Sequence, residues 1–351
     1  MRILIAEDDA ALAGFVRQGL VGEHYAVDVV EDGEQARAMG SEFDYDLVIL
    51  DLNLPKLDGV SVLRHLRLKR PSLPVLVLTQ RSRVEDRVQC LDTGADDYVP
   101  KQLSSTSLDI SHIREDLVAK IKAAAESRRV RDGLNLQRKP PRTADPATKK
   151  VAHGTAAIVA LGISTGGPKA LQEILPILPV DLPVPILIVQ HMPAGFIAAF
   201  AKRLNSLCAL SICEACHGAV VQPGVVYLAP AGFQMTVDRL PDSRTLIFLS
   251  GKAENQVHVP SVDVMMQSVA SAFHSRAMGI IMTGMGSDGA RGMKAIHHEG
   301  GLTVGQDEPS CAVYGMPRVC AEMGILDRVV PLSQIPHEIL QATHYRKTNT
   351  G

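Results

Sequence analysis

Three short turns, each directly after an apolar run, hold a serine, a histidine and an aspartate: Ser164, His191 and Asp288. The runs span residues 157–161, 185–189 and 278–282. A short apolar run that ends in a polar or glycine-rich turn is typical of a buried strand in a parallel α/β sheet. Such sheets place their chemistry in the crevice beyond the carboxyl ends of the strands. The pattern therefore predicts an α/β fold whose candidate active site combines these three residues.

The three residue types fit nucleophilic catalysis. A serine hydroxyl is a weak nucleophile at neutral pH and needs a base within reach. The imidazole of His191 can take the proton and return it to a leaving group, and Asp288 can hold the imidazole tautomer and stabilise its charged form. The glycines around Asp288 permit close backbone approach, so amides near Thr165 and Met285 are candidates to stabilise an oxyanion.

Each residue also has a structural explanation. Ser164 could cap the helix that follows it, and the turn 162–167 could hold a phosphate, although the lysine–hydroxyl ending of a Walker loop is absent. His191 could be a hydrogen-bonded loop histidine, and Asp288 could cap the helix after it. The chain order Ser, His, Asp differs from the usual α/β-hydrolase order, so the predicted hydrolase belongs to another lineage.

Length and composition predict two domains. The chain has 351 residues, of which 46% are hydrophobic, and a formal net charge of −2. The near-zero charge gives no support for a nucleic-acid partner. The first apolar run is too short for a signal peptide and no later run approaches a membrane span, so we expect a cytoplasmic protein without membrane insertion. Residues 125–152 are rich in Arg, Lys and Pro and predict a linker between domains at 1–124 and 153–345.

Two groups of cysteines differ in context. Cys213 and Cys216 precede His217 in a formal haem-attachment pattern with Cys208 nearby, but export and a second metal-binding pair are both missing, so we interpret the pattern as a coincidence. The remaining three, Cys90, Cys311 and Cys320, are expected to be small core residues.

Residues 1–124 alternate short aliphatic runs with segments of helical periodicity, which predicts a parallel sheet with helices on both faces. Glu7 and Asp8 follow the first run and Asp51 follows the third, so these carboxylates should meet at one sheet edge. A cluster of this kind suits Mg²⁺. Thr79 and Lys101 end or follow later runs and would supply a hydroxyl and an ammonium group to a phosphorylated aspartate.

This first domain resembles the response-regulator receiver, a flavodoxin-like, doubly wound fold. The matching segments are Ile5–Asp9, Asp51–Gly59 and Gly94–Tyr98. The resemblance implies that Asp51 accepts phosphate from a histidine kinase, that Glu7, Asp8 and Asp51 hold Mg²⁺, that Thr79 and Lys101 contact the phosphoryl group, and that Tyr98 is the switch aromatic. Gln80 and Gln102 replace the small residue and the proline that the family usually has, which bears on the lifetime of the phosphoaspartate.

Residues 155–340 resemble the catalytic domain of the chemotaxis protein-glutamate methylesterases (the CheB family), with a Rossmann-like parallel sheet. The matching segments are 161–168, 190–196, 222–224, 228–230, 260–264, 302–307 and 313–317. The resemblance covers the whole chain, because a receiver before this domain is the family's own arrangement. It implies a triad of Ser164, His191 and Asp288, with Thr165 and Met285 beside it and no cofactor for the esterase step.

The same resemblance implies hydrolysis of glutamate methyl esters on methyl-accepting chemotaxis receptors, deamidation of receptor glutamines, and phosphorylation by a histidine kinase of the CheA type. The receiver would cover the esterase cleft until it is phosphorylated. Gln234 and Val259 stand where the family commonly has a histidine and an arginine, so we expect these two loops to lose polar groups that border the substrate. The alternative is a signalling adaptor whose hydrolase domain only binds a partner.

Overall fold

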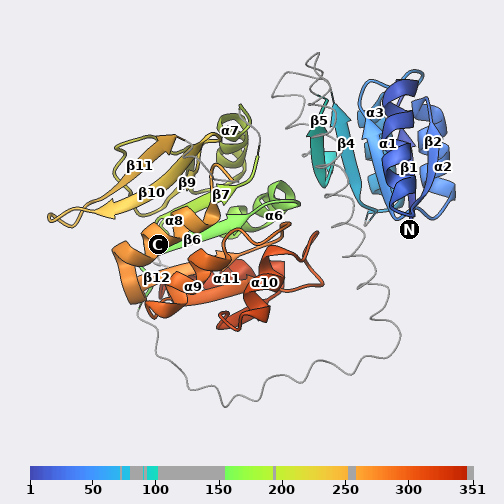
Figure 1. Ribbon diagram of the computed structural model, residues 1–351. Coiled ribbons are helices and arrows are strands. Elements are labelled where there is room, and N and C mark those ends of the chain that lie inside the picture. The colour runs from blue at the N-terminus through green and yellow to red at the C-terminus, as the bar shows by residue number, and fades with distance from the viewer. Residues whose placement is uncertain are drawn as a thin grey trace. The chain divides into compact units, whose positions relative to one another are not determined.

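The computed structural model describes residues 1–71, 73–79, 90, 93–101, 155–192, 195–251 and 258–345. The chain divides into two compact units, Met1–Arg129 and Val130–Gly351, each with its own parallel sheet (Figure 1). The predicted linker at 125–152 and both of its boundaries lie outside the described residues, so they stay predictions.

The first unit is a five-stranded parallel sheet in the order β2-β1-β3-β4-β5. Its strands are β1 (Arg2–Ala6), β2 (Ala26–Val30), β3 (Leu47–Asp51), β4 (Val75–Thr79) and β5 (Asp97–Pro100), and its described helices are α1 (Ala10–Gly22), α2 (Gly33–Glu42) and α3 (Gly59–Lys69). This is the flavodoxin-like strand order, which confirms the predicted doubly wound fold.

Aspartates cap the N-termini of the three helices in the described part of this unit. The carboxylates of Asp9, Asp32 and Asp58 accept hydrogen bonds from backbone N–H groups in the first turns of α1, α2 and α3. The Asp9 carboxylate therefore caps α1, and its role differs from that of its neighbours Glu7 and Asp8. Since the strand order reverses between β1 and β3, those two acids and Asp51 lie at the same sheet edge.

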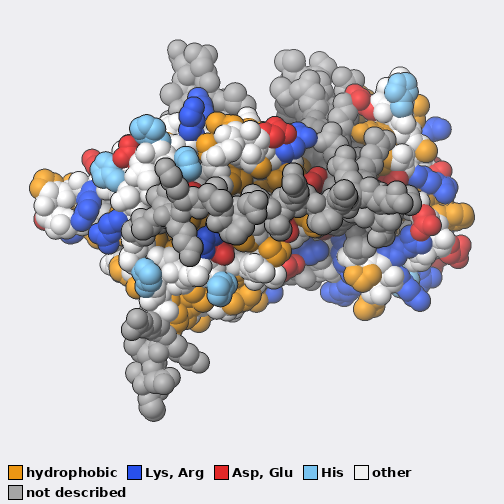
Figure 2. All heavy atoms as spheres, turned by 90° about the horizontal axis from the view of Figure 1, so that it is seen from below, with side chains coloured by type: hydrophobic (Ala, Val, Ile, Leu, Met, Phe, Trp, Pro, Cys, Tyr) orange, Lys and Arg blue, Asp and Glu red, His pale blue; other side chains and the backbone are white. Residues whose placement is uncertain are grey.

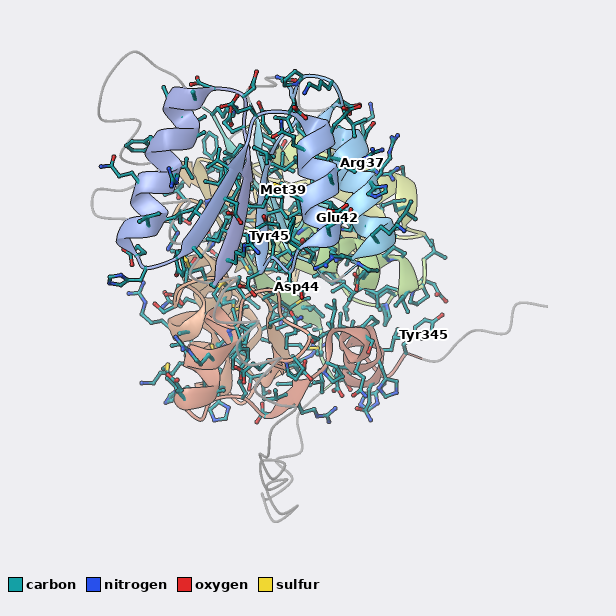
Figure 3. The ribbon with its side chains drawn as sticks, turned by 90° about the vertical axis from the view of Figure 1, so that its right-hand side faces the viewer. Arg37, Met39, Glu42, Asp44, Tyr45 and Tyr345 are labelled. Atoms are coloured by element: carbon teal, nitrogen blue, oxygen red, sulfur yellow. The ribbon has the colours of Figure 1, made fainter. Side chains whose placement is uncertain are left out.

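Tyr45 stabilises the sheet at the start of β1, opposite the edge that carries Glu7 and Asp8. Its side chain is fully buried, and its hydroxyl donates to Asp28 Oδ2 at 2.9 Å, an oxygen that also accepts from Arg2 Nε at 2.7 Å (Figure 3). Burial and the hydrogen bond to Asp28 raise the pKa of Tyr45 to about 12. This interaction joins β1, β2 and the segment before β3 away from the acidic edge.

The second unit is a seven-stranded parallel sheet in the order β14-β13-β12-β6-β7-β9-β8. Its strands are β6 (Ile158–Ile163), β7 (Ile186–Gln190), β8 (Ser211–Glu214), β9 (Val225–Leu228), β12 (Ala277–Ile281), β13 (Leu302–Gln306) and β14 (Arg328–Val330). Strands β6, β7 and β12 are buried throughout, as their uninterrupted apolar runs predict. The predicted parallel-sheet fold is confirmed.

The other elements of this unit cover the sheet. They are helices α6 (Gly167–Ile174), α7 (Ile197–Leu207), α8 (Val262–Phe273), α9 (Ala290–His298), α10 (Met316–Glu322) and α11 (Ile335–Ala342), 3₁₀ turns at Leu175–Ile177, His274–Arg276 and Leu332–Gln334, and strands β10 (Phe233–Arg239) and β11 (Thr245–Gly251). The sequence analysis did not predict the antiparallel pair β10–β11, which packs on α8 (Figure 1). Tyr345, beyond α11, donates its hydroxyl to Asp181 at 2.7 Å (Figure 3).

Acidic and basic side chains both occur on the face that Figure 2 shows, as the small net charge leads one to expect. Within the described residues, no helix combines the length and the apolar character that a membrane span requires. Cys90, Cys311 and Cys320 are buried, which confirms that they are core residues.

Close packing of α8 on β6 yields a stability prediction. A Cβ added at Gly162 would lie 2.2 Å from Val262 Cγ1, so Gly162→Ala should lower the free energy of unfolding by about 1–3 kcal/mol. Chemical denaturation measures this change. Gly251→Ala is the matched control, because nothing lies within 4 Å of its added Cβ and its effect should stay within about 0.5 kcal/mol. Equal effects of the two substitutions would contradict the packing argument.

Candidate functional site

The structure brings the three predicted residues of the second unit to one sheet edge. Strand β6 lies between β7 and β12, where the strand order reverses. His191 donates its backbone N–H to Ile163 O at 3.2 Å, and Ser164 donates its own to Thr283 O at 3.0 Å. Adjacent backbone hydrogen bonds therefore fix the serine and the histidine as neighbours, with the loop that leads to Asp288 on the other side of the serine.

Ser164 does not cap the helix that follows it. The N-cap of α6 is Gly166, which has a left-handed backbone (φ +80°), and no side chain accepts from the first turn of this helix. Among the described residues the Ser164 hydroxyl forms no hydrogen bond, and catalytic contacts of such a hydroxyl commonly close only when substrate binds. A Cβ at Gly284 would lie 2.7 Å from Ser164 Cβ, so the glycine lets the two loops meet.

The Asp288 carboxylate receives four hydrogen bonds. Its Oδ1 accepts from the Ser261 hydroxyl at 2.8 Å and from Asp263 N at 3.1 Å, while its Oδ2 accepts from Val262 N at 2.7 Å and from His191 Nε2 at 2.9 Å. Burial alone would raise the pKa of Asp288, but the bond from His191 and the amides of Asp263 and Val262 outweigh it and hold the pKa well below its usual value. Asp288 is therefore ionised at neutral pH.

Asp288 lies at the N-terminus of α8, and a residue of α8 binds the N-terminus of α9 in the same way. The carboxylate of Asp263, in the first turn of α8, accepts from Gly289 N at 3.0 Å and Gly292 N at 2.8 Å at the start of α9. It also accepts from Arg291 Nε at 2.8 Å. The expectation that Asp288 could cap its own following helix is wrong, because Gly289 is that N-cap and Asp288 serves the neighbouring helix instead.

Among the described residues, His191 uses one ring nitrogen, Nε2, in a hydrogen bond to a side chain. Since ionised Asp288 accepts from Nε2, that nitrogen carries the proton and Nδ1 is left as the acceptor. The His191 ring stacks on the ring of His258, with centroids 4.7 Å apart and planes 8° from parallel. Partial burial and the nearby His191 lower the pKa of His258, which favours an uncharged ring against the base.

Gln234 is a buried residue that holds a neighbouring turn. Its Nε2 donates to His258 O at 2.8 Å, and its Oε1 accepts from Ser261 N at 2.8 Å. That the loops of Gln234 and Val259 lose polar groups bordering the substrate stays a prediction. Gln234 braces the turn that carries His258, the cis Val259–Pro260 peptide and Ser261. Val259 is half-buried in that turn.

Thr165 follows Ser164 on the loop after β6, and Met285 follows Gly284, which packs against Ser164, on the loop after β12. Among the described residues, their backbone N–H groups donate to no protein acceptor. The Met285 side chain is 39% exposed. Two unpaired amides on loops that meet at Ser164 are suitable donors for an oxyanion.

Sequence reasoning missed the residues that support this site. His258, Ser261, Asp263 and Gln234 contact His191 or Asp288, or hold the turns that do, yet lie 25 or more residues from Asp288 in the chain. The run 260–264 carried the family resemblance, but nothing in its residue types indicates a bond to an aspartate on another loop.

The first unit holds the predicted acidic cluster. One oxygen each of Glu7, Asp8 and Asp51 lie within 4.8 Å of one another. Lys101 Nζ lies 2.6 Å from Glu7 and 2.9 Å from Asp51. Burial raises the pKa of Glu7, and Lys101 offsets this only in part. Asp51 Oδ1 is buried without a hydrogen-bond partner, and such an oxygen fits a divalent cation, because Mg²⁺ takes carboxylate ligands.

The predicted switch residues are placed only by their strands. Thr79 ends β4 and Tyr98 lies in β5, paired with Val77. The side chains of Thr79 and Tyr98, and all of Gln80 and Gln102, lie outside the described residues, so their roles stay predictions.

The cysteine pattern has exposed thiols. Cys213 and Cys216 are exposed and free, and His217 Nδ1 accepts from Leu249 N at 3.1 Å. Within the described part of the chain, the acidic cluster of the first unit is the only group arranged to hold a metal. That the pattern is a coincidence stays a prediction.

Two family models match this chain, one in each unit. Residues 159–339 match the family model for the CheB methylesterase, and residues 3–111 match that for the response regulator receiver domain. The chain belongs to the CheB methylesterase family. Its second unit is also similar to the crystal structure of the Thermotoga maritima CheB methylesterase catalytic domain, with 37% identity and a TM-score of 0.52, over 54% of this chain and 99% of that one.

Relatives of the family match over nearly their whole length. A protein-glutamate methylesterase/protein-glutamine glutaminase 1 of Geobacter sulfurreducens is 38% identical, over 97% of this chain and 96% of its own. A protein of the same name, without the number, from Pyrococcus horikoshii is 36% identical, over 97% and 93%. The CheB arrangement of a receiver followed by a methylesterase domain thus extends across this chain.

Asp288 gives the second unit a pH-dependent stability. Because its folded pKa lies below the unfolded value of about 3.9, its contribution is present above that pH and is lost as the pH falls toward the folded pKa. Asp288→Asn should therefore cost about 2 kcal/mol at pH 7 and progressively less below about pH 4. Unfolding of both proteins across this range measures the difference. Asp238→Asn, on the exposed face of β10, is the control, and a pH-independent cost at Asp288 would contradict the argument.

Proposed function

We propose that this protein is a protein-glutamate methylesterase in which Ser164, His191 and Asp288 form the catalytic triad and phosphorylation of the receiver regulates the esterase. The observation that carries the proposal is the 2.9 Å bond between His191 Nε2 and an ionised, four-fold hydrogen-bonded Asp288, one strand away from Ser164. The names and the whole-length similarity of the relatives support the substrate class.

In the first half-reaction Ser164 Oγ attacks the ester carbonyl carbon of a methylated glutamate, and its proton passes to His191 Nδ1. The imidazolium that forms lies between ionised Asp288 and the ring of His258, so its charge is stabilised without a proton moving to Asp288. The unpaired amides of Thr165 and Met285 would bind the oxyanion. Collapse of the intermediate expels methanol, which takes the proton from Nδ1.

In the second half-reaction water attacks the acyl-serine and gives its proton to Nδ1. Release of the glutamate carboxylate returns that proton to Ser164 Oγ, so the enzyme ends as it began. The same steps applied to a glutamine side chain release ammonia, which is the glutaminase reaction that the names of the relatives include. No cofactor is needed for either leaving group.

In the receiver we propose that Asp51 accepts the phosphoryl group, with Mg²⁺ held by Glu7, Asp8 and Asp51. The bound cation would neutralise charge on the phosphoryl oxygens. Lys101, which is buried against Glu7 and Asp51, would hold another of those oxygens. Thr79 and Tyr98 would respond by repacking, and this change in the receiver would raise the activity of the esterase.

The proposed partners follow from these two reactions. Methyl-accepting chemotaxis receptors supply the substrate, a CheA-type histidine kinase supplies the phosphate, and both reactions belong in the cytoplasm. The receiver is assigned to residues 1–124, the linker to 125–152 and the methylesterase domain to 153–345.

The esterase is tested by methanol release from a methylated receptor fragment. Ser164→Ala removes the nucleophile and should lower kcat at least about 1,000-fold, with a similar loss for His191→Gln. A serine-directed fluorophosphonate should label the wild type and not Ser164→Ala. Retention of wild-type activity by Ser164→Ala would contradict Ser164 as the nucleophile, whereas no methanol release by the wild type would favour the signalling adaptor.

Phosphorylation is tested on the full chain with a small phosphodonor and Mg²⁺. The donor should raise methanol release by the wild type, whereas Asp51→Asn should stay at the basal rate because it lacks the accepting carboxylate. Phosphate incorporation is measured in parallel. Stimulation that persists in Asp51→Asn, or its absence in a phosphorylated wild type, would contradict the regulation.

A further inference from the structure

Gln190, the last residue of β7, joins the backbones of the proposed nucleophile and base. Its side chain is 1% exposed. Its Nε2 donates to Ser164 O at 2.9 Å and to His191 O at 3.1 Å. One amide group thus binds carbonyls on the turns after β6 and β7, at the two residues that must be held together, and Ser164 O also accepts from Gly167 N at 2.8 Å.

The orientation of this amide follows from its partners. Both neighbours of Nε2 are carbonyl oxygens, which only accept, so the donor end of the amide must face them. Its Oε1 is buried without a partner. Leaving a buried acceptor unpaired is costly, and this cost sets Gln190 apart from Gln306, whose oxygen and nitrogen both have partners.

Gly167 leaves the space that Gln190 occupies. A Cβ added there would lie 2.0 Å from Gln190 Oε1 and 2.9 Å from its Cδ. The glycine at the start of α6 is thus required by the amide, which is wedged between that helix and the two carbonyls.

We propose that Gln190 is a positioning residue that holds Ser164 and His191 at reacting distance by binding both of their carbonyls. The inference rests on the proposed esterase function. A shift of about 1 Å between reacting groups can lower a rate on the order of 100-fold, so losing this tether should act on kcat.

The test replaces Gln190 by Met, which keeps the length and removes the donor. With methylated receptor fragment, Gln190→Met should lower kcat about 10- to 100-fold while KM changes less than about threefold. Thr303→Val is the matched control, because it removes a buried hydrogen bond at 2.7 Å to Ile325 O near the start of β13, and its kcat should match the wild type.

Gly167→Ala gives a second route to the same defect, because its Cβ displaces the Gln190 amide while the glutamine stays. The two substitutions together should cost no more than the worse one alone, since both remove one tether. If Gln190→Met does not fold, Gly167→Ala carries the test. Full kcat in a folded Gln190→Met, or an equal fall in Thr303→Val, would overturn the proposal. Activity that survives Ser164→Ala would instead overturn the proposed function.

Discussion

The second unit depends on two carboxylates that each bind the N-terminus of a neighbouring helix. The Asp288 carboxylate, just before α9, accepts hydrogen bonds from amides at the start of α8, and the Asp263 carboxylate, in α8, accepts hydrogen bonds from amides at the start of α9. Helix N-termini carry partial positive charge and unpaired donors, so each carboxylate is stabilised where it lies. These hydrogen bonds hold the loop after β12 against α8, and the same loop carries the Asp288 that accepts from His191. Ser261 completes the arrangement by donating to Asp288.

The two units place their functional side chains at the same position of a parallel sheet, but one site suits a cation and the other a developing anion. In both, functional side chains follow strands at a point where the strand order reverses. The receiver edge gathers Glu7, Asp8 and Asp51, with Lys101 against Glu7 and Asp51, and among the described residues Asp51 Oδ1 is buried without a hydrogen-bond partner. At the esterase edge the Asp288 carboxylate accepts four hydrogen bonds, and among the described residues the amides of Thr165 and Met285 donate to no protein acceptor. The first edge is built to take a cation and the second to take a developing anion.

Much of this could be predicted from the sequence, because apolar runs report buried strands directly. The apolar runs of β6, β7 and β12 alone predict that Ser164, His191 and Asp288 follow strands at one sheet edge. The stacking of His258 and the tether of Gln190 could not be predicted, since they depend on side-chain geometry between distant strands. The bonds of the buried Gln234 amide could not be predicted either, because both of its backbone partners lie far from it in the chain.

The double use of Asp288 constrains how this protein can change over evolutionary time. A mutation at Ser164 removes a hydroxyl that binds nothing else among the described residues, so the fold can lose it without harm. A mutation at Asp288 leaves Ser261 and two helix amides unpaired and weakens the packing of α8 with α9. Some descendants of this chain could lose catalysis and persist as binding proteins. We expect them to lose the serine first and to keep the aspartate, because the aspartate stabilises the fold.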